Sequence, residues 1–177
     1  TVHHAALVHR DVKPSNILLD ADGKLVVFGS LFGGRENAVQ DRVDGDKRFA
    51  GVRLGPGDAM IVRTGRWAKR AAEGPWNYGQ QAAGLHASVL PWLKARDVSL
   101  LASDAVNDVQ PSGIQGINRP VHQLTQVNMG LPLVDDAYTE DAAVEAARLK
   151  RWEFMLTWSI YQIPGGTASP FNALATF

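Results

Sequence analysis

The sequence contains no cysteine, which excludes disulfide-bonded frameworks and thiolate metal sites. Any metal bound by this chain must therefore be held by His, Asp or Glu. The chain also has no excess of positive or negative charge, because 18 Lys and Arg residues balance 18 Asp and Glu residues. We therefore expect no overall electrostatic field that would draw the protein to nucleic acid or to an anionic membrane surface.

Long hydrophobic runs are absent as well. No apolar stretch approaches the roughly 20 residues that a membrane-spanning helix needs, and the sequence does not open with a basic-then-apolar export signal. We expect a soluble cytoplasmic protein with neither a nucleic-acid nor a membrane partner. The 177 residues, 45% of them apolar, are enough for one domain with a sizeable core.

The first 51 residues differ in character from the rest of the chain. Two short β-type runs, at 17–19 and 25–28, flank an Asp-Ala-Asp-Gly turn signal, and this pattern predicts a β-hairpin within residues 1–30. Residues 31–51 are rich in Gly, Asp, Arg and Asn, with few apolar side chains, which is typical of a linker.

From Val52 onward, short apolar runs alternate with helical patterns, which predicts an α/β fold with a mixed β-sheet and flanking helices. The segments expected as buried strands are 59–63, 98–102 and 131–134, and those expected as helices are 88–96 and 121–129.

The C-terminal part continues this alternation. Thr139 is placed to cap a helix whose first turn carries acidic residues. Residues 154–163 alternate apolar and polar side chains, with Phe154, Leu156, Trp158 and Ile160 on one face, which predicts a half-buried strand. Gly165 and Gly166 end it, and 173–177 is expected to be a last strand.

Residues 9–20, HRDVKPSNILLD, resemble the catalytic loop of Ser/Thr protein kinases. In that family the matching Asp11, Lys13 and Asn16 would accept the substrate proton, face the phosphate and hold Mg²⁺. The family's metal-binding Asp-Phe-Gly, however, reads Val27-Phe28-Gly29 here, and no Ala-Pro-Glu segment follows. We therefore interpret residues 1–30 as a kinase-like fragment without phosphotransferase chemistry.

Residues 52–177 resemble the later part of the cyclase family, metal-dependent hydrolases that include kynurenine formamidase-like arylformamidases. The matching segments, in the family's order and spacing, are LGPGDAMIVRTGRW (54–67), AGLHASVLPWLKARDVSLLASD (83–104), NDVQPSGIQGINRPVHQLTQVNMGLPLVDD (107–136) and RWEFMLTWSIYQIPGGTASPFNALATF (151–177). The resemblance implies a swivelling β/β/α domain, N-terminally incomplete in this chain, a small-molecule substrate and assembly as a homo-oligomer.

The resemblance also implies a divalent metal, Zn²⁺ or Mn²⁺. His122, in Pro-Val-His at a helix start, matches the family's distal His ligand, and Asp135, with Asp136 as the alternative, matches its later carboxylate. Imidazole and carboxylate suit either metal. The family's early His-x-Gly-Thr-His-x-Asp segment, which supplies most ligands, and the His after it, which is the catalytic base, have no counterpart in the sequence.

Three further residues are candidates for a substrate pocket. Asp104 and Asp108 lie at and after the end of a predicted strand, where α/β sites gather, although solvated loop carboxylates are the plainer interpretation. Trp67, with Trp76 and Trp92, would suit an apolar mouth for an aromatic substrate, or would pack in the core. His86, just before a helix, is interpreted as structural.

Two functions are compatible with these patterns. The first is a metal-dependent hydrolase of amide, formamide or ester bonds, which would need ligands beyond His122 and Asp135. The second is a non-catalytic binding or oligomerisation module that keeps the sheet without the catalytic machinery. The resemblance favours the first function, and the missing His-rich segment favours the second.

Overall fold

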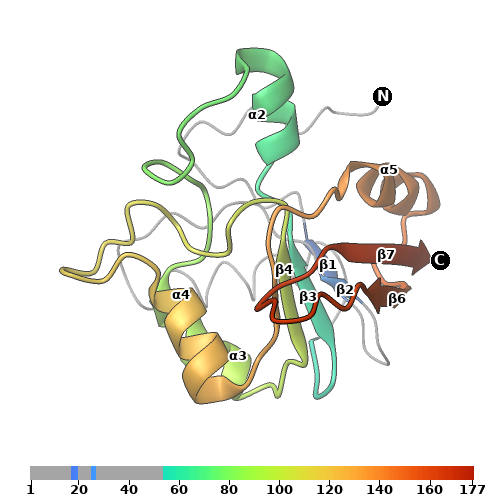
Figure 1. Ribbon diagram of the computed structural model, residues 1–177. Helices are drawn as coiled ribbons and strands as arrows, with labels where there is room; N and C mark the ends of the chain where they lie inside the picture. The colour runs from blue at the N-terminus through green and yellow to red at the C-terminus, as the bar shows by residue number, and fades with distance from the viewer. Residues whose placement is uncertain (1–16, 20–24, 27–53) are drawn as a thin grey trace.

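A computed structural model describes residues 17–19, 25–26 and 54–177 of the chain (Figure 1). The kinase-like motif from His9 to Asn16 and the predicted linker at 31–51 lie outside the described residues. Every candidate metal and pocket residue lies within the described part of the chain.

A five-stranded sheet forms the centre of the fold. Its strands are β1 (Ile17–Leu19), β2 (Leu25–Val26), β3 (Ala59–Val62), β4 (Leu100–Ser103) and β5 (Leu133–Val134). Strands β3, β4 and β5 are adjacent and parallel, and all residues of β3 and β4 are buried. Continuous apolar runs are typical of parallel strands covered on both faces, which is why the sequence predicts these three segments correctly.

The two N-terminal strands each pair with β3. β1 is antiparallel to β3 and β2 is parallel to it, so β1 and β2 run in opposite directions, as the arms of a hairpin do. The predicted turn between them, at 20–24, lies outside the described residues, so the hairpin itself stays a prediction.

Short helices cover one face of the sheet. They are η1 (Ala87–Val89), α3 (Leu90–Lys94), α4 (Pro120–Gln123) and η2 (Leu124–Met129, a π-helix). Their apolar side chains share one core with Met60, Val62 and Leu101, which all point to this face of the sheet. The helices predicted at 88–96 and 121–129 are confirmed within a residue or two at their ends.

The opposite face is covered by α5 (Glu140–Leu149) and a two-stranded sheet of β6 (Met155–Ile160) and β7 (Phe171–Thr176), as Figure 1 shows. A second core forms there around Ile61, Ala102, Ala146 and Phe154. The fold is thus of the α/β class, as predicted: a sheet of parallel and antiparallel strands with helices on both faces.

Three details of the prediction are wrong. Helix α2 (Arg66–Glu73) was not predicted; it has no buried residue and therefore leaves no apolar stripe of core residues in the sequence. Thr139 precedes α5, but its side chain makes no capping hydrogen bond. In β6, the burial expected along one face stops after Leu156, because Trp158 and Ile160 are 46% and 64% exposed.

Candidate metal centre

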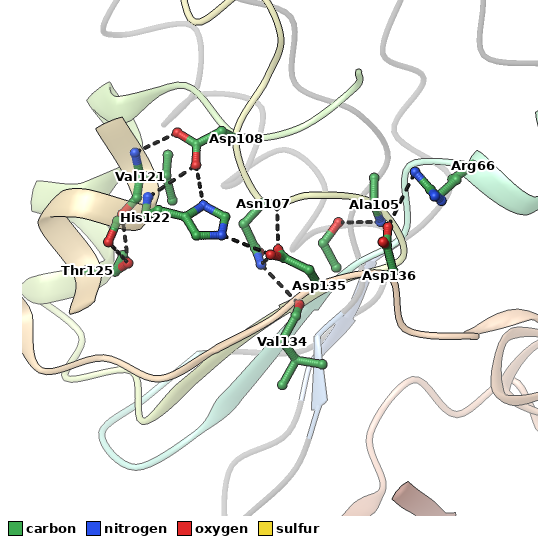
Figure 2. A network of polar contacts seen from close by, with 11 residues as sticks. Arg66, Ala105, Asn107, Asp108, Val121, His122, Thr125, Val134, Asp135 and Asp136 are labelled. Atoms are coloured by element: carbon green, nitrogen blue, oxygen red, sulfur yellow. Dashed lines mark hydrogen bonds and ion pairs between the residues drawn. The ribbon is translucent and has the colours of Figure 1, made fainter. Parts of the chain in front are cut away.

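The His122 imidazole lies between two carboxylates (Figure 2). Its Nδ1 is 2.5 Å from Oδ2 of Asp108, and its Nε2 is 2.8 Å from Oδ2 of Asp135. His122 comes from the start of α4, where Pro120 fixes the first helical position, and Asp135 directly follows β5. The structure therefore brings together the two residues predicted as metal ligands, and adds Asp108.

Asp108 anchors the start of α4 as well as the imidazole. Its carboxylate accepts hydrogen bonds from the backbone N–H groups of Val121 (2.7 Å) and His122 (3.1 Å). A carboxylate at a helix N-terminus is favoured by the otherwise unpaired amides there. Asp108 is fully buried, so its interpretation as a solvated loop carboxylate is wrong.

Asn107 orients the second carboxylate and was not identified from the sequence. Its backbone N–H and its side-chain Nδ2 donate to Oδ1 of Asp135 at 2.9 and 2.8 Å, and Nδ2 also donates to the Val134 carbonyl at 3.0 Å. Because Oδ1 is engaged by Asn107, Oδ2 of Asp135 is left facing His122. Asn107 and Asp108 are consecutive, so one short loop holds both sides of the imidazole.

The two carboxylates change the protonation of the imidazole. Hydrogen bonding to Asp108, then to Asp135, raises the pKa of His122 to about 9 despite the opposing effect of burial. The pKa of Asp135 is lowered: burial opposes this change, but the hydrogen bonds from His122 and Asn107 outweigh it. Without metal, the cluster is an imidazolium between carboxylates, and His122 must lose a proton before its Nε2 can bind a cation.

The donor set fits part of a divalent metal site. An imidazole Nε2 facing a carboxylate oxygen matches Zn²⁺ or Mn²⁺, and a carboxylate behind Nδ1 is the usual support of a metal-binding histidine. Within residues 54–177, however, no group of three or more His, Asp or Glu side chains could hold a metal. A metal site built on His122 and Asp135 would therefore need at least one more protein ligand.

Asp136, the alternative ligand, points away from His122. Its backbone is left-handed (φ 56°), its N–H donates to the Ala105 carbonyl at 3.1 Å, and its carboxylate lies 3.3 Å from Nη1 of Arg66. Figure 2 shows the two neighbouring carboxylates turned to different partners. Asp135, and not Asp136, is therefore the carboxylate of the His122 cluster.

Asp104 is also buried and is not a solvated loop carboxylate. Its two oxygens accept hydrogen bonds from the backbone N–H groups of Thr64, Gly65 and Arg66 at 2.6, 3.0 and 3.1 Å, which fixes the start of α2. Burial, opposed by these hydrogen bonds, raises its pKa to about 6. Asp104 is bound to the backbone and is fully buried, so no open pocket reaches it.

The tryptophans lie in different environments. Trp67 donates from Nε1 to the Ala137 carbonyl at 2.8 Å and stacks at a tilt on Tyr138, with 5.6 Å between ring centroids. Trp92 packs in the core, and the Arg66 guanidinium carbon lies 5.5 Å from the centroid of the Trp76 ring. His86 accepts a hydrogen bond from the Ser88 N–H at the start of η1, which agrees with its structural interpretation.

Comparison with known proteins identifies the fold. No family profile and no curated protein sequence matches the chain. The crystal structure of a protein described as a novel cyclase superposes with a TM-score of 0.64 and 24% identity, over 78% of this chain and 46% of that one. The fold is cyclase-like. The chain spans less than half of that cyclase's length.

Two further structures share the cyclase-like fold. A potential metal-dependent hydrolase with cyclase activity aligns over 97% of this chain and 71% of its own length, with 11% identity and a TM-score of 0.56. A predicted metal-dependent hydrolase from Bacillus stearothermophilus aligns over 93% and 77%, with 13% identity and a TM-score of 0.55. In the described part of the chain, no helix has the length and apolar character needed to cross a bilayer.

Proposed function

We propose that this chain contributes to a divalent-metal hydrolase that cleaves amide, formamide or ester bonds of a small molecule, as an arylformamidase does. The observation that carries the proposal is the placement of His122 Nε2 2.8 Å from Asp135 Oδ2, with Asp108 behind Nδ1. The cyclase-like fold supports it, because two similar structures are described as metal-dependent hydrolases.

In this proposal each residue of the cluster has one task. His122 Nε2 and Asp135 Oδ2 hold the cation; Asp108 accepts the Nδ1–H, which keeps the imidazole in the tautomer with a free Nε2. Asn107 keeps Oδ1 of Asp135 occupied, so that Oδ2 stays directed at the site. When bound, Zn²⁺ or Mn²⁺ supplies Lewis acidity toward a carbonyl and lowers the pKa of water.

The remaining ligands and the catalytic base are proposed to come from outside residues 54–177 or from a second copy of the chain. Self-association is therefore part of the proposal. Ile160 and Leu174, on β6 and β7, are 64% and 68% exposed, and association with a second copy would remove such apolar side chains from water. Sedimentation velocity over a range of concentrations would measure it; a monomer at all concentrations would contradict this part of the proposal.

The test is a hydrolysis assay with matched variants. The metal-free chain would be loaded with Zn²⁺ or Mn²⁺ and given an aryl formamide and an aryl ester. We expect His122→Gln and Asp135→Asn to lower kcat/KM by roughly 100-fold or more, and Asp136→Asn, the adjacent carboxylate, to change it little. Turnover that is unaffected by His122→Gln would contradict the proposal.

A second candidate function is a binding module without catalysis. The observation that favours it is the His122–Asp135 contact itself, since at 2.8 Å the two charged side chains stabilise each other without a metal. In that case His122→Gln would lower the stability of the metal-free protein, and Zn²⁺ would not raise the melting temperature of the unmodified chain.

A further inference from the structure

The ribbon formed by β6 and β7 is covered only in part by the rest of the chain. The two strands are antiparallel and pair with each other alone within the described residues (Figure 1). Leu156, near the start of β6, is buried in the second core, but every residue of β6 after it is exposed, and so is β7 after Phe171. A two-stranded ribbon is marginally stable in water unless one of its faces packs on other elements. The outer part of the ribbon thus lacks cover from the described part of the chain.

The uncovered part of β6 continues the face that is buried at its start. Leu156, Trp158 and Ile160 alternate with polar residues along the strand, so their side chains point to the same side. Their exposed fractions rise in that order, from 7% to 46% and 64%. The sequence pattern is that of a strand with one buried face, and the chain buries only the first part of that face. Burial of Trp158 and Ile160 as well requires a second apolar surface.

The ribbon carries no charged residue. Residues 155–177 contain no Asp, Glu, Lys or Arg, although these residues make up 20% of the whole chain. Exposed edge strands are normally protected from association by charged side chains, above all lysine. In a two-fold symmetric contact, a residue near the axis meets its own counterpart, so a charged surface repels its copy and an uncharged one does not. The composition therefore favours a second copy of the chain over a partner that is recognised by its charge.

The apolar area is large enough for a specific interface. In the loop that follows β6, Tyr161 and Ile163 are 71% and 46% exposed, in addition to Trp158 and Ile160. Since a large side chain presents roughly 150 to 250 Å² when fully exposed, these four residues expose on the order of 500 Å² per copy. Burying them in both copies would remove on the order of 1,000 Å² of surface, which is the lower end for a specific protein–protein interface.

We propose that the β6–β7 ribbons of two copies of the chain pack on each other, with Trp158 and Ile160 of each copy at the centre of a two-fold symmetric interface. Self-association is part of the proposed function; this proposal rests on that part and names the surface that makes the contact. It needs neither a metal nor turnover, so a failure of the hydrolysis assay and a failure of this interface are distinguishable.

Sedimentation equilibrium of the metal-free chain tests the proposal with variants at position 160. We expect the unmodified chain to form a dimer with a Kd of about 10 μM or below. Ile160→Lys would place an ammonium group in the apolar contact and near its own copy, so it should weaken the dimer roughly 30-fold or more. Val127→Lys is the matched control, because Val127 is 81% exposed on η2, which packs on the other face of the central sheet. This control should leave the Kd unchanged.

A mixture of Ile160→Lys and Ile160→Glu separates a ribbon-to-ribbon contact from any other dimer. Each variant alone opposes like charges across the two-fold axis, whereas the mixture pairs opposite charges. The heterodimer should therefore be at least about tenfold tighter than either homodimer. Three results would overturn the proposal: an unmodified chain that stays monomeric up to about 100 μM, an Ile160→Lys variant that dimerises like the unmodified chain, or a mixture no tighter than its components.

Discussion

At the scale of single residues, the central feature is a histidine held from both sides by carboxylates. Asp108 and Asp135 stabilise the protonated imidazole, so His122 has a pKa of about 9 in the metal-free protein. The same Nε2 is the atom that would bind a metal. Protons and metal ions therefore compete for one nitrogen, and the protonation of His122 reports directly on the cluster.

This competition gives the first prediction. An NMR titration of the imidazole nitrogens in metal-free protein should show His122 titrating near pH 9. Asp135→Asn should lower that pKa by about one unit or more, because a carboxylate next to the imidazolium is lost. Asp136→Asn, whose side chain is turned to Arg66, should leave the pKa nearly unchanged. A His122 that titrates near 6.5 in all three proteins would contradict the described geometry.

The residues of this cluster differ in how far the sequence reveals them. His122 and Asp135 are identified only through the resemblance to the cyclase family, whose ligand positions they match as the His of Pro-Val-His and the Asp after a predicted strand. Asn107 and Asp108 form hydrogen bonds with residues that lie 13 to 28 positions later in the chain. No local pattern records such contacts, and an Asn-Asp pair in a loop is indistinguishable from solvated loop residues until the fold is known.

At the scale of elements, α2 shows how a distant side chain can define a helix. Its eight residues contribute no buried side chain, and its N-cap position is a glycine in the left-handed region (φ 83°). The first amides are satisfied instead by Asp104, about 40 residues away in the sequence. Such a helix has no start signal that the sequence alone displays, and for this reason the sequence does not predict it.

Asp104 gives the second prediction. Its pKa of about 6 lies above the 3.8 of the unfolded chain, so the folded protein keeps a proton that the unfolded chain has released. This contribution to stability is present in full below about pH 4 and is lost as the pH rises through about 6. Urea unfolding at several pH values should show the stability of the wild type, relative to Asp104→Asn, falling by on the order of 3 kcal/mol between about pH 4 and 7. A difference in unfolding free energy between the two proteins that does not change with pH would contradict this prediction.

The β6 strand gives the third prediction. Phe154, just before β6, is fully buried in the second core, whereas Ile160 at its other end is 64% exposed. Phe154→Ala should lower the free energy of unfolding by about 3 to 5 kcal/mol, and Ile160→Ala by less than about 1 kcal/mol. Chemical denaturation measures both. At protein concentrations at which the chain is monomeric, equal losses in the two variants would contradict the described burial of Phe154 and exposure of Ile160.

At the scale of the whole molecule, the end of β5 connects the two faces of the sheet. Asp135 turns toward α4 and His122, while Asp136, with left-handed backbone, turns toward Arg66. Both also line a cavity of about 720 Å³ on the face of the sheet that α5 covers. The alternation of buried strands and helices made the α/β class and the main strands predictable. The left-handed backbone of Asp136 (φ 56°) and its contact with Arg66 have no local signal in the sequence, which left Asp136 as an alternative to Asp135.

Calorimetric titration with Zn²⁺ at about pH 8, in two buffers of different ionisation enthalpy, tests the central claim most directly. We predict binding to the wild type with release of a proton by His122, binding about 10- to 100-fold weaker in His122→Gln and Asp135→Asn, and unchanged binding in Asp136→Asn. Zn²⁺ binding that releases no proton, or that survives His122→Gln undiminished, would contradict the assignment of His122 and Asp135 as metal ligands.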